Sequence, residues 1–253
     1  MNKIRSITFS LLLLLLVCTI SAQAAPETIP IPSLKIDVGQ ASGPEEVAVT
    51  LQLIALLTLL SLAPSLLILT TAFTRIVIVL SLLRNAIGTQ QVPPNQVIIG
   101  LALFLTFFVM APVLNNVNTN ALQPYLREEI SFNEALQKAM SPLREYMRNQ
   151  TRESDLKLFL EMHGETQVSD VEAIPDYVLM PAYLISELKT AFQMGFILFI
   201  PFIVIDMVVA SILMSMGMLM LPPVMISLPF KILLFVMVDG WSLVTRSLVL
   251  SFR

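Results

Sequence analysis

The chain has 253 residues, of which 56% are hydrophobic and 13% are charged, about half the charged share of a soluble globular domain. Its 15 basic side chains stand against 18 acidic ones, so the sequence lacks the basic surface that nucleic-acid binding requires. The long uncharged stretches also exclude a disordered tail or a coiled coil. We therefore take a membrane as the environment of this chain.

The first 24 residues have the pattern of a secretory signal peptide. Lys3 and Arg5 precede an apolar run, and Ala22-Gln23-Ala24 has the small-x-small form of a cleavage site. We expect cleavage after Ala24, which also removes Cys18 and leaves a mature chain without a disulfide or a thiolate site. The alternative is an uncleaved membrane helix, for which the apolar run is short.

A flexible leader is predicted over residues 25–46, which contain four prolines and two glycines. The first pair of hydrophobic helices follows at 47–114. Its first member has no charge from residue 47 to 74, continues to residue 83 and is expected to kink at Pro64. A turn containing Pro93-Pro94 separates it from the second member at 97–114.

Residues 115–185 are predicted to form a polar, extracytoplasmic helical domain. Asparagines replace the apolar pattern after Leu114, and residues 115–189 hold 19 of the 33 formal charges. Ser131 and Glu134 have the spacing of a capping box, so we expect a helix to begin there. Residues 155–162 predict another short helix.

The second pair of hydrophobic helices is predicted over residues 186–253, with apolar runs at 182–213 and 224–250. These runs are continuous rather than alternating, and in lipid each backbone donor must be satisfied within its own segment. The predicted fold class is therefore all-α: four long apolar helices in hairpins, with a helical polar insertion.

The distribution of basic residues fits a simple membrane topology poorly. An external N-terminus places the loops at 84–96 and 214–223 in the cytoplasm, with Arg75 and Arg84 on the expected side. The second loop has no basic residue, however, and Arg246 and Arg253 fall outside. Either this topology is wrong, or the helices are not conventional lipid-facing spans.

The sequence predicts neither an enzyme nor a cofactor or metal site. The single histidine, His163, lacks the second histidine of a zinc-protease helix, and we expect it in an exposed loop. There is no glycine-rich phosphate loop and no nucleophile elbow.

Methionines cluster at the start of the expected turn between the last two hydrophobic helices. Gly217 and Pro222-Pro223 predict that the helix breaks there, which leaves a loop lined by thioethers. Such flexible side chains, converging on an axis, could close around a variable surface. The alternative is that they are ordinary apolar fillers. The four methionines are Met214, Met216, Met218 and Met220.

Ionisable groups within apolar helices mark function or assembly. Asp206 and Lys231 lie 14 and 11 residues from Met220, so an antiparallel hairpin would place them at similar depth, where they could pair. Glu187 is a competing partner for Lys231, especially from a neighbouring subunit; alternatively, Glu187 and Lys231 pair with water. Seven residues separate Asp239 from Arg246, too far apart along a helix for a direct bond.

Several long motifs carry a resemblance to a known family. Residues 181–192 read Pro-Ala-Tyr-Leu-Ile-Ser-Glu-Leu-Lys-Thr-Ala-Phe, and the methionine run ends in Leu-Pro-Pro. Residues 228–235 read Leu-Pro-Phe-Lys-Ile-Leu-Leu-Phe, with Asp-Gly-Trp at 239–241. Together with the stretch from Leu-Thr-Thr-Ala-Phe-Thr-Arg at 69–75 to Pro-Pro-Asn-Gln at 93–96, they resemble the FliP family of flagellar type III export gate subunits.

The resemblance implies a channel-forming core subunit that conducts unfolded flagellar proteins across the bacterial inner membrane and is needed for flagellum assembly. It implies five copies in a helical channel with FliQ and FliR, contacts with FlhA, FlhB and lipid, and a basal-body location with a large periplasmic-side portion. By the same resemblance the four methionines form a channel gasket, and Glu187 and Lys231, with Asp206, are candidates for intersubunit ion pairs.

Three alternatives remain open from the sequence. A virulence-type secretion gate subunit would share the fold, but those relatives typically lack a cleavable leader. A small-molecule transporter predicts inverted repeats and a polar cluster at mid-membrane, which the sequence does not display. A plain membrane scaffold would have no channel.

Overall fold

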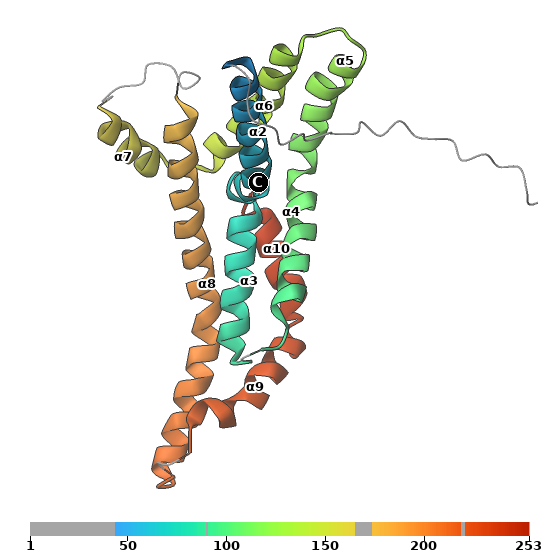
Figure 1. Cartoon of the computed structure of the whole chain (residues 1–253). Coiled ribbons are helices and arrows are strands. Elements are labelled where there is room, and N and C mark those ends of the chain that lie inside the picture. Colours follow the sequence, from blue (N-terminus) through green and yellow to red (C-terminus); the bar gives the residue numbers. More distant parts are fainter. Residues whose placement is uncertain (1–43, 90, 165–173, 219–220, 253) are drawn as a thin grey trace, which may run out of the picture. The chain divides into compact units, whose positions relative to one another are not determined.

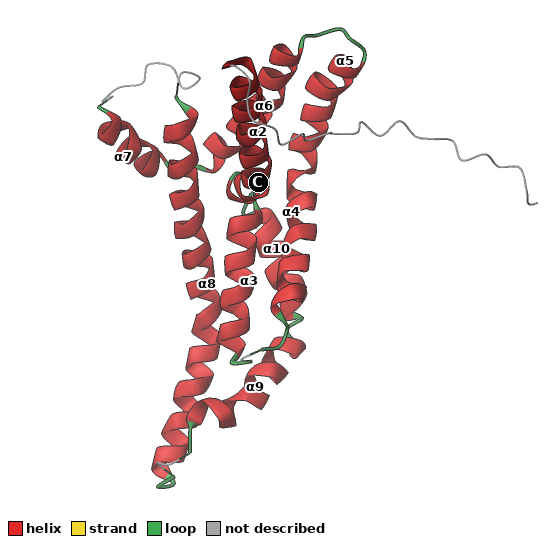
Figure 2. Ribbon diagram, in the orientation of Figure 1, coloured by secondary structure: helices red, strands yellow, loops and turns green. Residues whose placement is uncertain are grey.

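The computed structural model describes residues 44–89, 91–164, 174–218 and 221–252. These residues form helices and loops without a strand among them (Figure 2), which confirms the all-α class. The predicted signal peptide, its cleavage at Ala24 and nearly all of the leader lie outside this described part. The chain divides after Gln52 into two units; of the first, the structure describes only the opening turns of α2, and the packing below belongs to the second.

Ten helical elements follow one another in the described residues (Figure 1). They are α2 (Pro44–Leu69), α3 (Phe73–Ile87), α4 (Asn95–Val117), the π-helical turn η1 (Asn118–Leu122), α5 (Gln123–Leu126), α6 (Phe132–Gln150), α7 (Glu153–His163), α8 (Asp176–Ser215), α9 (Pro223–Met237) and α10 (Gly240–Leu250).

The core is built around α3, which lies alongside α8 and also contacts α4 and α9. Its buried residues Ile76, Val79, Leu80 and Leu83 recur at the spacing of one helical face. The backbones of α3 and α8 approach closely, since a Cβ added to Gly195 on α8 would lie 2.2 Å from Cδ1 of Leu82.

The interval 47–114 holds three helices, where the sequence predicted a pair. The uncharged run breaks between Leu69 and Phe73 instead of continuing to residue 83. The carbonyl of Thr71 accepts a hydrogen bond from the Tyr183 hydroxyl at 2.8 Å, a tertiary contact that the apolar pattern cannot reveal. Pro64 lies within α2 without ending it.

The prediction that a helix ends at Leu114 was wrong by about three turns. Helical structure continues from α4 through η1 and α5 to Leu126, across all four asparagines. Asparagine lowers helix propensity only modestly, and packing of α6 against α4 and η1 supports this segment.

The polar region forms helices as predicted. Ser131 caps α6 by accepting a hydrogen bond from the backbone N–H of Glu134 at 3.3 Å. The second expected helix is α7. His163 is exposed, but it is the last residue of α7 rather than part of a loop, and its Nε2 lies 2.9 Å from the Tyr177 hydroxyl oxygen.

The last apolar run, predicted as one helix over 224–250, is two helices inclined by 65° to one another. At the bend Asp239 has a left-handed backbone with φ of 51°. Gly240 is required next to it, because an added Cβ would lie 2.2 Å from the Phe235 ring.

Three described helical stretches are long and apolar enough to cross a membrane, with a fourth if the bent pair α9 and α10 counts as one span. The three are Thr50–Leu69, Asn95–Leu126 and Asp176–Ser215. In none of them is more than about a fifth of the apolar window buried within the chain. Lipid or other protein must cover the remainder.

Candidate functional site

The methionine cluster lies at the turn between α8 and α9. Gly217 adopts φ of +75° after the end of α8, a left-handed conformation that glycine accepts without strain. The backbone N–H of Met218 donates to the Leu213 carbonyl at 2.9 Å, and that of Gly217 donates to the Met214 carbonyl at 3.0 Å. These two bonds form a Schellman motif, so the helix ends where the glycine predicted.

The thioether side chains of this turn are exposed. Met216 is 67% exposed, Met214 and Met218 are also exposed, and Met220 lies outside the described residues. Exposed apolar side chains of this kind are typical of surfaces that contact protein or a membrane. The gasket role of the four methionines stays a prediction.

Arg75 and Glu187 form a fully buried ion pair between α3 and α8. The Arg75 Nε donates to Glu187 Oε2 at 2.9 Å, and Nη2 donates to Oε1 of the same carboxylate. The guanidinium also donates to the Ser251 carbonyl at 2.7 Å and to Gln150 Oε1 at 3.0 Å. The Phe252 ring stacks on its carbon at 4.0 Å. Four segments of the chain therefore meet at one cation.

A second ion pair joins the buried Lys231 to the partly exposed Asp206. The Lys231 Nζ lies 2.6 Å from Asp206 Oδ2 and 3.3 Å from the Ala86 carbonyl at the end of α3. Ser227 donates to the other oxygen of Asp206. The ammonium thus neutralises both a carboxylate and the negative end of a helix dipole. The hairpin spacing correctly brought Asp206 and Lys231 together.

A further carboxylate, Asp155, is buried and attaches α7 to α8. It accepts a hydrogen bond from Ser186 at 2.9 Å and pairs with Lys189. Burial raises the pKa of Asp155, but the hydrogen bonds from Lys189 and Ser186 and the charges of Lys189 and Arg152 outweigh burial, so the pKa lies below its ordinary value. The carboxylate is therefore held in its charged form.

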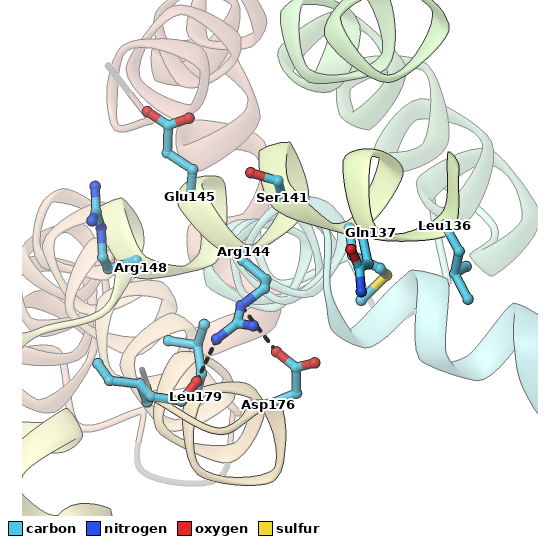
Figure 3. A pocket seen from close by; sticks show the side chains of 10 residues that line it. Leu136, Gln137, Ser141, Arg144, Glu145, Arg148, Asp176 and Leu179 are labelled. Carbon is cyan, nitrogen blue, oxygen red and sulfur yellow. Dashed lines mark hydrogen bonds and ion pairs between the residues drawn. The ribbon is translucent and has the colours of Figure 1, made fainter. Parts of the chain in front are cut away.

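A polar hollow of about 740 Å³ lies between α6 and the first turns of α8. Figure 3 shows Arg144 reaching from α6 toward Asp176, and its Nε lies 3.2 Å from Asp176 Oδ1. Arg144 also donates to the Ile174 carbonyl. These contacts of Arg144 connect α6 to the start of α8 across the hollow. The described residues contain no group of three His, Cys, Asp or Glu side chains able to hold a metal ion.

Of the three ion pairs that hold α8, the sequence predicted the one between Asp206 and Lys231 and missed the other two. Of the two partners considered for Lys231, Asp206 is the one it has in the same chain. Glu187, the competing candidate, instead pairs with Arg75. Arg75 was assigned to the cytoplasmic charge pattern, yet its side chain is buried. Its position within an apolar run was the available signal, because such a charge normally faces a partner.

Comparison with known proteins places these features in a family. The FliP family model matches residues 56–248. The chain is 57% identical to the flagellar biosynthetic protein FliP of Bacillus subtilis, over 86% of this chain and 98% of the relative. The proteins of the same name from Pectobacterium carotovorum and Aquifex aeolicus are 54% and 50% identical, over 83% and 88% of this chain and 82% and 92% of their own lengths. This chain therefore belongs to the FliP family.

Proposed function

We propose that this chain is a channel-forming subunit of the flagellar type III export gate, through which unfolded flagellar proteins cross the inner membrane. The observation that carries the proposal is the exposed methionine turn at the tip of an apolar helical hairpin, in a member of a flagellar biosynthesis family. Thioether side chains are unbranched and polarizable, so several such turns can seal against one another and still yield to a passing chain.

The proposed assembly has five copies of this chain with FliQ and FliR, and with FlhA and FlhB nearby. Support comes from the unburied apolar windows of the long helices, which need a cover. In the proposed location, α6 and α7 form the periplasmic-side portion of an inner-membrane complex. Residues 1–24 would direct the chain there and be cleaved after Ala24.

The proposed mechanism is passive conduction without catalysis or a cofactor. The buried charges support this view, because Arg75, Glu187, Asp155 and Lys231 are each engaged in structural contacts. Energy for export would then come from partner proteins.

Side-chain exposure indicates which of the proposed intersubunit residues, Glu187, Lys231 and Asp206, can contact a neighbouring copy. The side chains of Glu187 and Lys231 are 0% and 4% exposed, whereas that of Asp206 is 29% exposed. Asp206 is thus the member that a cation of a neighbouring copy can reach. The other two would act by fixing the helices that carry the interface.

The test is to replace the four turn methionines by alanine and measure both assembly and leakage. We expect the complex to be recovered at the normal size while cells take up a small membrane-impermeant dye. Replacing Met162, an exposed methionine of α7, is the matched control and should leave the membrane tight. An assembled complex that stays tight with all four alanines overturns the gasket, and loss of assembly assigns the turn to packing instead.

A further inference from the structure

The C-terminal apolar helices α8, α9 and α10, taken from residue 177 to 252, contain six charged side chains. Four of them pair within the chain: Glu187 with Arg75, Lys189 with Asp155, and Asp206 with Lys231. Among the described residues, Asp239 and Arg246 have no such partner in the same chain.

These two charges sit on a surface that is otherwise apolar. Asp239 and Arg246 are exposed, and Met237, Val236 and Leu243 beside them are 75%, 68% and 54% exposed. An apolar surface of this kind is covered by lipid or by protein. A charge covered with it requires a partner of opposite sign.

The two charges cannot satisfy each other in one chain. They are seven residues apart, on either side of the start of α10, which separates them by about 10 Å along the helix axis. Asp239 also has a left-handed backbone at the 65° bend, where its side chain is exposed.

Arg246 lies in a shallow hollow of about 560 Å³ on the outer face of α10. The hollow is lined by Trp241, Ser242, Thr245, Arg246 and Val249. It thus offers a guanidinium and two hydroxyl donors without an acidic side chain, which is the donor set that a carboxylate accepts from.

We propose that Asp239 of one copy of this chain pairs with Arg246 of the next copy, its carboxylate seated in that hollow. This inference rests on the proposed homo-oligomer and names one of its contacts. A lipid phosphate would satisfy Arg246 but leave Asp239 unpaired, whereas a second copy satisfies both charges at once. The contact is heterologous, so repeating it from copy to copy builds a ring or a helical array.

The first experiment removes the two charges singly and together. Asp239→Asn keeps a residue that tolerates the left-handed backbone, and Arg246→Gln keeps length and polarity. Each single change should weaken association between copies at least about tenfold, because it leaves the other charge covered and unpaired. The double variant should lose no more affinity between copies than the single variant that associates more weakly. If the losses of the two single variants simply add in the double variant, the two side chains do not pair and the proposal is overturned.

Lys157 and Glu161 provide the matched control, since they are an exposed ion pair on α7 with 4.0 Å between their charged atoms. Lys157→Gln and Glu161→Gln should leave association unchanged. A loss equal to that of the α10 variants would assign the effect to net charge and overturn the specific contact.

The second experiment reads the contact directly. Two differently tagged chains, one carrying Asp239→Cys and the other Arg246→Cys, both with Cys18→Ser, are co-expressed and treated with a short bis-maleimide. A cross-linked band containing both tags is expected. If native mass spectrometry finds several copies together but that band is absent, the pair is wrong while the oligomer stands. If the unsubstituted chain forms no oligomer, both proposals fail.

Discussion

Arg75 and Glu187 are 112 positions apart in the sequence, yet the guanidinium and the carboxylate share two hydrogen bonds, and both side chains are buried. Paired in this way, two charges that would each be very unfavourable in an apolar interior define how α3 and α8 align. The geometry is bidentate, which lysine could not reproduce in place of Arg75.

Glu187→Gln should destabilise the fold by about 3–5 kcal/mol, because the buried guanidinium loses its counter-charge. Thermal unfolding of the detergent-extracted protein is the measurement. Arg127→Gln, which breaks an exposed pair with Glu129, should change stability by less than about 1 kcal/mol. Equal effects of the two substitutions would contradict the burial argument.

Because Lys231 and Asp206 form an ion pair, we expect replacement of both residues to be less destabilising than replacement of Asp206 alone. Asp206→Asn alone removes the counter-charge of the buried ammonium, which is then left with neutral acceptors such as the Ala86 carbonyl, and should be strongly destabilising. Adding Lys231→Met removes the unpaired charge and should restore most of the lost stability. Unfolding midpoints of the two singles and the double measure this coupling, and an additive result would refute it.

The close approach of α3 and α8 predicts a steric effect at Gly195. Gly195→Ala should cost about 1–3 kcal/mol, since the new methyl group would overlap Leu82. Gly100→Ala on α4 is the control, because nothing lies within 4 Å of its added Cβ. That change should be neutral or stabilising by up to about 1 kcal/mol. Leu82→Ala should partly rescue Gly195→Ala.

Docking of α7 should depend on pH through Asp155. Its pKa is lower in the folded protein than in the unfolded chain, so in acid the unfolded state binds more protons. The stabilisation is therefore complete above the ordinary aspartate pKa of about 3.9 and is lost as the pH falls through the folded value. Hydrogen exchange of residues 153–163, corrected for its intrinsic rate, measures this loss.

Asp155→Asn provides the control for that titration. It should reduce protection of α7 by about 1.5–3 kcal/mol at neutral pH, because a charged hydrogen-bond acceptor is lost. It should also remove the dependence on acid. A variant that retains the acid transition would show that another group is responsible.

Local signals in the sequence predicted much of the architecture. Ser131 and Glu134 begin a helix because a cap is a contact between neighbours in the chain. Gly217 ends α8 for the same kind of reason. The Asp239-Gly240 bend had a usable signal, a turn dipeptide inside an apolar run.

The hydrophobic pattern of the sequence could not predict contacts between distant segments. The break after Leu69 depends on Tyr183 meeting Thr71, and the partner of Glu187 depends on the alignment of α3 with α8. Hydrophobic periodicity identifies the face that is buried, but it does not identify the residue on the other side.

The bond from Arg75 to the Ser251 carbonyl also fixes an order of events. The two residues are 176 positions apart, so the ribosome makes Arg75 and Glu187 well before it makes Ser251 and Phe252. During that interval Glu187 and Gln150 have been made, but the Ser251 carbonyl and the Phe252 ring that stacks on the guanidinium have not. Translation interrupted before Ser251 would leave this cation incompletely satisfied. The last contact of the core can form only after synthesis has passed that residue.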